Sequence, residues 1–259
     1  MKQILVIPNR AEMDAYLDLS RQYEAGFEYN EFFMPAVLDD ETECEKVMKA
    51  YRQQSMPSYT TVHGAFFDVI PFSPDERIKQ VSRLRIDQSI AVAKRLGAKA
   101  VVFHTGYNPR LNSVTYVEKW IKENAAYWSD ILAKHPDINI YLENTFEETP
   151  EVLEDLSEQL SRYPNYGVCL DYAHASLSKT EPTIWAEQLG RFVKHIHIND
   201  NDGISDLHLA WGDGVISRKQ FYEDYETYMK GATVLVETAS FENAAKSLQK
   251  LKEEGFLDN

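Results

Sequence analysis

Short apolar runs alternate with longer amphipathic stretches along the whole chain. The short runs are rich in Val, Ile, Leu, Phe and Tyr, which is typical of strands in a sheet buried on both faces. Strands separated by helix-length segments predict βα units and a parallel sheet. The expected strands are residues 3–7, 26–29, 59–62, 100–103, 139–142, 167–170, 193–198 and 233–236.

The segments between these runs have apolar residues spaced three and four apart, which predicts amphipathic helices. Pro74, Pro150 and Pro182 stand near the starts of three of them, where proline is tolerated. Gly97 and Gly255 follow the ends of two, as helix-terminating glycines do. The expected helices are residues 12–22, 41–53, 75–96, 114–134, 151–161, 184–189, 218–229 and 242–253.

This alternation predicts a closed (β/α)8 barrel, the TIM barrel, formed by residues 1–259 as a single domain. Such barrels typically have about 250 residues, which is close to the length of this chain. No repeat, low-complexity tract or linker rich in Pro, Gly and Ser divides the sequence. An open doubly wound sheet is the alternative, but the first strand leads into PNR instead of a glycine-rich phosphate-binding turn.

The composition is that of a soluble protein. Hydrophobic residues make up 44% of the chain, yet no stretch approaches the roughly 18 consecutive apolar residues of a membrane span. Charges and a proline interrupt the apolar run near the N-terminus, which disfavours a secretory signal. Cys44 falls in a charged helical stretch and Cys169 in an apolar strand, a poor arrangement for a disulfide. We therefore expect a cytoplasmic protein that does not bind membranes.

The formal net charge of -14 argues against nucleic acid or anionic lipid as a partner, because such binding rests on clustered Lys and Arg. Divalent metal ions would change this balance locally, since they are often the largest charges in a site. The charge of the whole chain and the charge of a metal-containing pocket therefore have to be considered separately.

Nine side chains of the kinds that bind metal ions stand at or just after the ends of predicted strands. Imidazole and carboxylate without thiolate suit Zn, Mn, Co or Fe(II). The active site of a TIM barrel forms at the carboxyl ends of its strands, where these residues fall. The sequence therefore predicts a metal-dependent active site. The nine residues are His63, His104, Glu143, Asp171, His174, His197, Asp206, His208 and Glu237.

Individual histidines and carboxylates of this kind also have structural interpretations. A single histidine at a strand end, such as His63, is more often hydrogen-bonded to a neighbour than bound to metal. We expect His195, on the same strand as His197, to face the opposite way and to pack under a helix. Glu143 and Glu237 have no basic neighbour in sequence, and burying an unpaired carboxylate is costly. We therefore expect a metal ion to be the partner of these carboxylates once they are buried.

Three stretches resemble motifs of the xylose isomerase-like barrel superfamily. HIHINDNDGISDLHLAWGDGVI is similar to the seventh-strand signature of its sugar phosphate isomerase/epimerase group, GVCLDYAHA to the sixth-strand motif and LVETAS to the eighth. The resemblance covers strands three to eight. The superfamily includes sugar phosphate isomerases and epimerases, ketohexose 3-epimerases and endonuclease IV.

The resemblance implies that Glu143, Asp171, His197 and Glu237 bind one divalent metal ion: Zn, Mn, Co or Mg. It also implies that Glu143 and Glu237 are the acid and base of an isomerase or epimerase. One would remove the proton beside a carbonyl and the other would return it, through a metal-stabilised enediolate. The implied substrate is a small carbohydrate or sugar phosphate.

The nine-residue pattern is also similar to that of endonuclease IV, which implies up to three zinc ions and hydrolysis of a phosphate ester by hydroxide generated at the metals. The implied ligand sets are His63, His104 and Glu143 for the first ion, Glu143, Asp171, His197 and Glu237 for the second, and His174, Asp206 and His208 for the third.

The predicted loops at the barrel mouth depart from both groups. They carry few cations beyond Arg10, Arg110 and Lys179, which disfavours duplex DNA as a substrate. The loop NDNDGISDLH lacks the arginine with which ketohexose epimerases contact sugar hydroxyls. These departures weaken the nuclease interpretation and make ordinary epimerisation of free ketoses doubtful.

Further side chains are candidates for contact with a substrate. Phe66 and Trp211 are aromatic residues that could cover a small substrate, although loop packing explains them equally well. Arg110 and the turn containing Gly212 and Gly214 are candidate phosphate contacts.

Three functions stay open on sequence alone. The preferred one is a metal-dependent sugar or sugar phosphate isomerase/epimerase. The second is a trinuclear zinc phosphoesterase similar to endonuclease IV, and the third is a non-catalytic, metal-stabilised sugar-binding protein. Association into a homo-oligomer is compatible with a barrel of this kind, but no feature of the sequence selects an interface.

Overall fold

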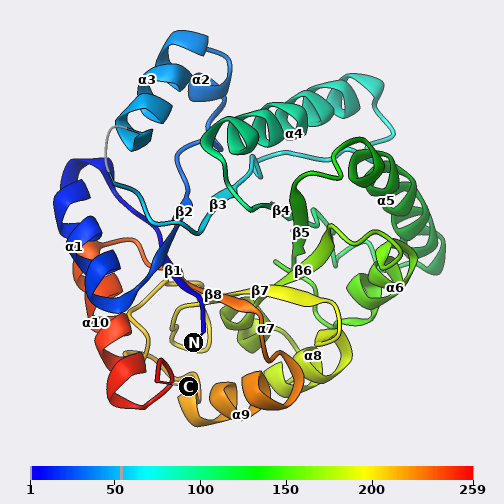
Figure 1. The fold of residues 1–259 in the computed structure, drawn as a ribbon. Coiled ribbons are helices and arrows are strands. Elements are labelled where there is room, and N and C mark those ends of the chain that lie inside the picture. Colours follow the sequence, from blue (N-terminus) through cyan, green and yellow to red (C-terminus); the bar gives the residue numbers. More distant parts are fainter. Residues whose placement is uncertain (1, 53–54, 259) are drawn as a thin grey trace.

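The computed structural model, which describes residues 2–52 and 55–258, forms a closed parallel barrel surrounded by helices (Figure 1). The strands follow one another around the barrel in chain order, and β1 pairs with β8 to close it. This is the expected TIM barrel, and each strand lies within one residue of its predicted bounds. The strands are β1 Ile4–Val6, β2 Gly26–Tyr29, β3 Thr60–His63, β4 Ala100–His104, β5 Asn139–Glu143, β6 Tyr166–Asp171, β7 Val193–Ile198 and β8 Thr233–Val236.

Ten α-helices are found in the described part of the chain, and eight of them correspond to the predicted ones. The two that were not predicted, α2 and α7, are too short to show an amphipathic repeat. Predicted helical residue Gln53 lies outside the described residues. The helices are α1 Met13–Tyr23, α2 Pro35–Leu38, α3 Glu41–Arg52, α4 Glu76–Leu96, α5 Val114–Lys134, α6 Glu151–Leu160, α7 Tyr172–Leu177, α8 Pro182–Leu189, α9 Arg218–Tyr228 and α10 Phe241–Glu253, with a 3-10 turn, η1, at Arg10–Glu12.

The predicted helix boundaries have local causes. The Asp75 side chain caps α4 by accepting a hydrogen bond from the Arg77 N–H at 2.8 Å. Gly97 ends the same helix with φ 73°, a left-handed conformation that glycine adopts without steric cost. Pro182 is in the first turn of α8. None of the helices that the structure describes is long and apolar enough to cross a bilayer.

Alternate residues of the strands pack in two different places. Val101, Phe103 and Leu142 belong to the large core in which the helices also take part. Ala100, Val102, Tyr141 and Cys169, which alternate with core residues, form a separate small apolar cluster. Because successive strand residues point to opposite faces, this cluster lies inside the barrel. The carboxyl ends of the strands, by contrast, carry buried ionisable residues.

Candidate metal centre

Neighbouring strand ends bring most of the predicted ligands together. One ligand atom from each of Glu143, Asp171, His197 and Glu237 lies within 4.8 Å of the others. These residues end β5, β6 and β7 or directly follow β8. The strand register explains their proximity, since Asp171 is paired with His197 in adjacent strands. This is the four-residue set that the resemblance implied for a single metal.

A second group contains His63 and His104, at the ends of β3 and β4, together with Glu143. Glu143 Oε2 lies 3.3 Å from His63 Nε2 and 3.7 Å from His104 Nε2. Its other oxygen, Oε1, lies 3.4 Å from His197 Nδ1. The two oxygens of Glu143 therefore face two different ligand groups, as a carboxylate between two ions would.

Unsatisfied buried atoms show that the four-residue group fits a cation. Asp171 Oδ2, His197 Nδ1 and Glu237 Oε2 are buried and have no hydrogen-bond partner. Asp171 uses only its other oxygen, which caps α7 by accepting the His174 N–H at 2.6 Å. His197 Nδ1 and Glu237 Oε2 approach to 3.2 Å without hydrogen-bond geometry. Buried polar atoms are rarely left without a partner. A divalent ion with tetrahedral or octahedral coordination would be a partner for all three of these atoms.

His174, Asp206 and His208 form a third cluster at the mouth. Asp206 Oδ2 lies 3.3 Å from His174 Nε2 and 3.1 Å from His208 Nε2. Asp206 and His208 come from the loop between β7 and α9, and His208 has φ 49°, an uncommon conformation for a residue other than glycine. Such strain is frequently found at functional sites.

Backbone carbonyls fix the orientation of three of these histidines. Nδ1 of His63, His174 and His208 contacts the carbonyl oxygen of Gly64, Asn144 and Glu237, at 3.0, 2.9 and 3.2 Å respectively. A carbonyl only accepts hydrogen bonds, so Nδ1 carries the proton and the lone pair of each neutral ring is on Nε2. Metal-binding histidines commonly have this arrangement.

The Nε2 atoms of these rings face carboxylates, so without a metal they attract protons. Burial lowers the pKa of His174, but the charges of Asp171 and Asp206 outweigh it and hold that pKa well above its ordinary value. For His208, burial is likewise outweighed by the Asp206 hydrogen bond, and the pKa is raised to about 9. Burial raises the pKa of the Asp171 carboxyl to about 7. A metal ion binding here would displace protons.

Glu28 on β2 is a site residue that the sequence analysis missed. It is fully buried, and its two oxygens lie 3.3 Å from His197 Nε2 and 3.2 Å from His195 Nε2. It also accepts a hydrogen bond from the Thr61 hydroxyl at 2.6 Å. Glu28 Oε1 and His197 Nε2 approach without hydrogen-bond geometry, and the other ring nitrogen, Nδ1, faces Glu143 and Glu237. The signal in the sequence was a charged residue in the middle of the apolar run GFEY.

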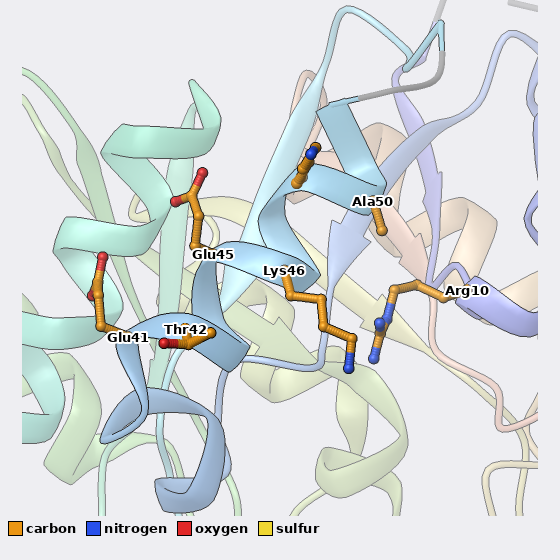
Figure 2. A pocket seen from close by; sticks show the side chains of 7 residues that line it. Arg10, Glu41, Thr42, Glu45, Lys46 and Ala50 are labelled. Atoms are coloured by element: carbon orange, nitrogen blue, oxygen red, sulfur yellow. The ribbon is translucent and has the colours of Figure 1, made fainter.

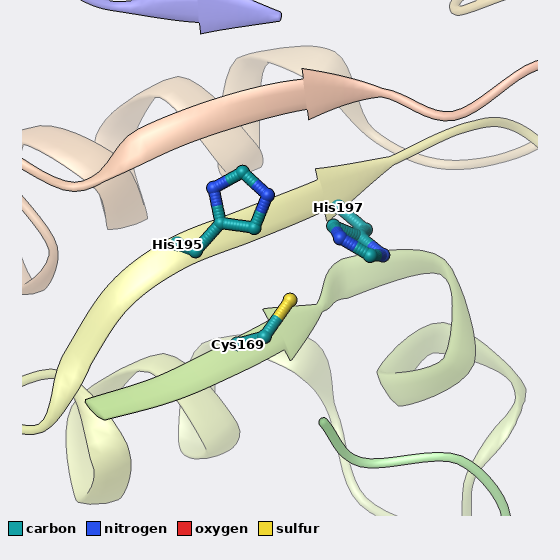
Figure 3. A group of neighbouring side chains, drawn as sticks. All are labelled: Cys169, His195 and His197. Atoms are coloured by element: carbon teal, nitrogen blue, oxygen red, sulfur yellow. The ribbon is translucent and has the colours of Figure 1, made fainter. Parts of the chain in front are cut away.

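The prediction that His195 faces away from His197 was wrong. Residues two apart in a strand share a face, so both rings lie inside the barrel, with centroids 5.0 Å apart (Figure 3). Cys169 of β6 lies beside them, and it forms a further group of candidate ligands with the two histidines. Burial raises the pKa of the Cys169 thiol well above its ordinary value, so it stays protonated and is a poor ligand.

The structure places the three predicted substrate contacts in different surroundings. Phe66 lies beside the second ligand group, with its ring centroid 4.7 Å from that of His104. Trp211 is fully buried and packs edge-on against Phe221, so the prediction that it covers a substrate was wrong. Arg110 is exposed in the loop after β4, where its backbone N–H donates to Asn108 Oδ1 at 3.1 Å.

The turn containing Gly212 and Gly214 is not a phosphate site. The Gly212 N–H donates to Asp200 Oδ2 at 2.9 Å, and a Cβ at Gly214 would lie 2.1 Å from the Asn201 carbonyl oxygen. The Asp200 carboxylate therefore occupies the place where a bound phosphate was predicted. Gly214 has to be glycine because the Asn201 backbone leaves no room for a Cβ atom. Asp200 instead anchors the loop that carries Asp206 and His208.

A hollow of about 460 Å³ in the described part of the chain has two candidate ligands, His208 and Glu237, in its lining. A larger and more open hollow of about 850 Å³ lies along α3 and is lined by Arg10 and by Glu41, Glu45 and Lys46 (Figure 2). The smaller hollow is the one that gives access to the predicted ligands, and the larger one contains none of them.

Curated proteins are similar to this chain over most of its length. The uncharacterized protein MJ1311 of Methanocaldococcus jannaschii is 31% identical over 203 residues, covering 74% of this chain and 68% of that protein. A second protein of that organism, MJ1614, is 26% identical over 217 residues, or 77% and 79% of the two chains.

Solved structures match along nearly the whole chain. The TTHB071 protein of Thermus thermophilus, soaked with ZnCl2, is 25% identical with a TM-score of 0.77 and coverage of 98% and 99%. A D-tagatose 3-epimerase-like protein is also 25% identical, with a TM-score of 0.78 and coverage of 100% and 98%. The family model of the xylose isomerase-like TIM barrel matches residues 20–254. The chain therefore belongs to the xylose isomerase-like TIM barrel family.

Proposed function

We propose that this protein is a divalent-metal-dependent isomerase or epimerase that transfers a proton beside the carbonyl group of a small carbohydrate. The observation that carries the proposal is the convergence of Glu143, Asp171, His197 and Glu237, three of which present buried ligand atoms without a partner. When bound there, a metal ion would polarise the carbonyl and lower the pKa of the adjacent C–H.

The two glutamates have different surroundings, which suggests different roles. Glu237 lines the smaller hollow, where it can meet a substrate carbon and remove or return a proton. Glu143 belongs to two ligand groups and is buried, and although burial raises its pKa, neighbouring histidines lower it well below the ordinary value. It is therefore ionised and suited to hold the metal as well as to act on the opposite side of the substrate. Phe66, whose ring lies against that of His104, would cover an apolar face of the sugar.

The names of similar structures support this assignment. One is a D-tagatose 3-epimerase-like protein, and another was soaked with zinc chloride. Each is 25% identical in sequence to this chain, and each aligns with nearly the entire barrel. We accordingly propose a carbohydrate substrate and Zn, Mn, Co or Mg as the metal.

The two cysteines, Cys44 and Cys169, are free and buried, which fits a location in a reducing cytoplasm.

A phosphoesterase with several metal ions is the second candidate. It is favoured by the additional groups around His63 and His104 and around Asp206, which could hold further ions. The charges at the mouth oppose it, because Arg10 and Lys179 are each paired with a glutamate at 2.6 Å. A polyanionic substrate would have to compete with these carboxylates.

Metal content and hydrogen exchange test the proposal together. Protein purified without chelator is expected to contain about one tightly bound ion per chain. In D2O it is expected to incorporate deuterium beside the carbonyl of a ketose or ketose phosphate. About three ions, with hydrolysis of bis(p-nitrophenyl) phosphate and without deuterium incorporation, would establish the second candidate instead.

Glu28 gives a prediction that does not depend on turnover. Replacing Glu28 with glutamine is expected to weaken metal binding about 10- to 100-fold, because the amide lacks the negative charge that lies within 3.3 Å of both His195 and His197. Competition with a chromophoric chelator would measure the affinity. The matched control is Glu43→Gln, which removes a surface carboxylate paired with Lys46. Equal affinities in the two variants would show that Glu28 does not orient His197.

A further inference from the structure

The hollow beside Glu237 indicates what kind of substrate enters the site. It lies where the chain leaves β1, β2 and β8, and Asn9, Asn30, Glu31, Thr238 and Glu237 are among its lining residues. A substrate whose reacting carbon is at Glu237 would extend into this space. Its volume of about 460 Å³ is within the range of small-molecule sites.

Two residues of the wall have hydrogen-bonding oxygens without a partner. Asn30 Oδ1 and Thr238 Oγ1 are buried beneath its surface, so these side chains have to turn toward the hollow to meet a ligand. The amide oxygen requires a donor, and the threonine hydroxyl can donate or accept. Hydroxyl groups of a ligand supply both functions, so a polyhydroxylated chain would satisfy atoms that are otherwise unpaired at a cost in free energy.

The charges in the same wall disfavour binding of a phosphate. Glu31 and Glu237 contribute carboxylates, and none of the lining residues in the described ranges is Lys or Arg. The histidine of the wall, His208, has its Nε2 3.1 Å from the Asp206 carboxylate. Arg10, which faces the larger hollow in Figure 2, donates from Nε to Glu31 at 2.6 Å. Glu31 also accepts a hydrogen bond from the Tyr51 hydroxyl at 2.8 Å, which holds its carboxylate in place. The charge of Arg10 is thus directed to Glu31 and is not available to a ligand.

We propose that this hollow binds the uncharged, polyhydroxylated end of an unphosphorylated sugar, and that Glu31 excludes a phosphorylated end by occupying Arg10. This inference rests on the proposed isomerase or epimerase function, and it narrows that function from sugars and sugar phosphates to free sugars. It runs against the expectation drawn from the loop NDNDGISDLH, which lacks the arginine of the ketohexose epimerases. Glu31 is a specificity residue, because it acts on the far end of the substrate and not on the reacting carbon.

Binding of unreactive alditols to the manganese-loaded protein tests the proposal by calorimetry. Wild-type protein is expected to bind D-sorbitol about tenfold more tightly than D-sorbitol 6-phosphate, because the phosphate meets the carboxylate of Glu31, whose partner Arg10 is not free to bind it. Glu31→Gln is expected to reverse or abolish this preference by releasing Arg10. Thr238→Val is expected to weaken sorbitol binding about 2- to 10-fold through loss of one hydrogen bond. Glu43→Gln, the matched charge control, is expected to leave both affinities unchanged.

Other results would overturn the proposal. These are binding of sorbitol 6-phosphate as tight as that of sorbitol in the wild type, binding of neither compound, or an unchanged preference in Glu31→Gln. Deuterium exchange separates this inference from the function on which it rests. Exchange into a ketose phosphate but not into free ketoses would overturn the inference and leave the function standing, whereas exchange into neither would overturn the function itself.

Discussion

Replacing Glu237 with glutamine is expected to lower the rate of deuterium incorporation into a ketose about 10²- to 10⁴-fold, the range that a positioned acid or base contributes. The amide keeps the size and the oxygen ligand of the glutamate but cannot take up a proton. Among the described residues, Glu237 is the one candidate metal-ligand carboxylate in the lining of the hollow, so the substitution changes a group that can meet the substrate there.

Two measurements accompany this variant. The metal content should remain that of the wild type, which would show that the effect is on proton transfer and not on metal binding. Glu242→Gln serves as the control, since Glu242 is an exposed carboxylate in the first turn of α10. Retention of more than a tenth of the wild-type rate would remove Glu237 from the acid/base role. A sugar-binding protein without activity would show no exchange even as wild type, and the variant would change only its affinity.

Addition of the physiological metal to chelator-treated protein is expected to raise the melting temperature by roughly 8 to 16 °C. At a free metal concentration about 1,000 times Kd, a ligand that binds only the folded state stabilises it by about 4 kcal/mol. For a chain of this size, about 1 kcal/mol corresponds to roughly 2 to 4 °C. The gain is plausible on structural grounds because Glu143, Asp171 and Glu237 bring three carboxylates together, and a cation relieves their repulsion.

Differential scanning calorimetry with Zn, Mn, Co and Mg would measure the shift and rank the metals. Asp171→Asn should reduce it strongly, because Asp171 Oδ2 is one of the unpaired ligand atoms. Lys246→Gln, which breaks a surface ion pair with Asp213, should leave the shift intact. A shift below about 2 °C with every metal, at concentrations well above any physiological Kd, would argue that the cluster does not bind a metal ion.

The histidines and carboxylates at strand ends show how far local sequence can locate a site. In a parallel barrel, all strands run the same way, so residues at their carboxyl ends converge at one mouth whatever the packing elsewhere. This is why Glu143, Asp171 and His197 could be placed near one another from the strand pattern alone. The short helix α7 was not foreseen, although its cap, Asp171, was identified for another reason.

Apart from His195, where the two-residue period of a strand was misapplied, the errors arose where the answer depended on tertiary contacts. Trp211 stands in the same motif as His208, and only tertiary packing buries it against Phe221. Gly212 looked like an anion-binding turn until the fold placed Asp200 on its N–H group. Glu28 was missed because its partners, His195 and His197, are far away in sequence on β7.

The amino-acid sequence by itself determined the eight-stranded barrel and the set of ligand-bearing strand ends, because apolar periodicity and the direction of parallel strands are local properties that need no knowledge of distant contacts. Only the tertiary structure decided which ligand atoms face one another, that Glu28 orients His197, and that Glu31 pairs with Arg10 beside the hollow. These relations join different βα units, and the free energy of a buried carboxylate depends on the partners that folding brings to it.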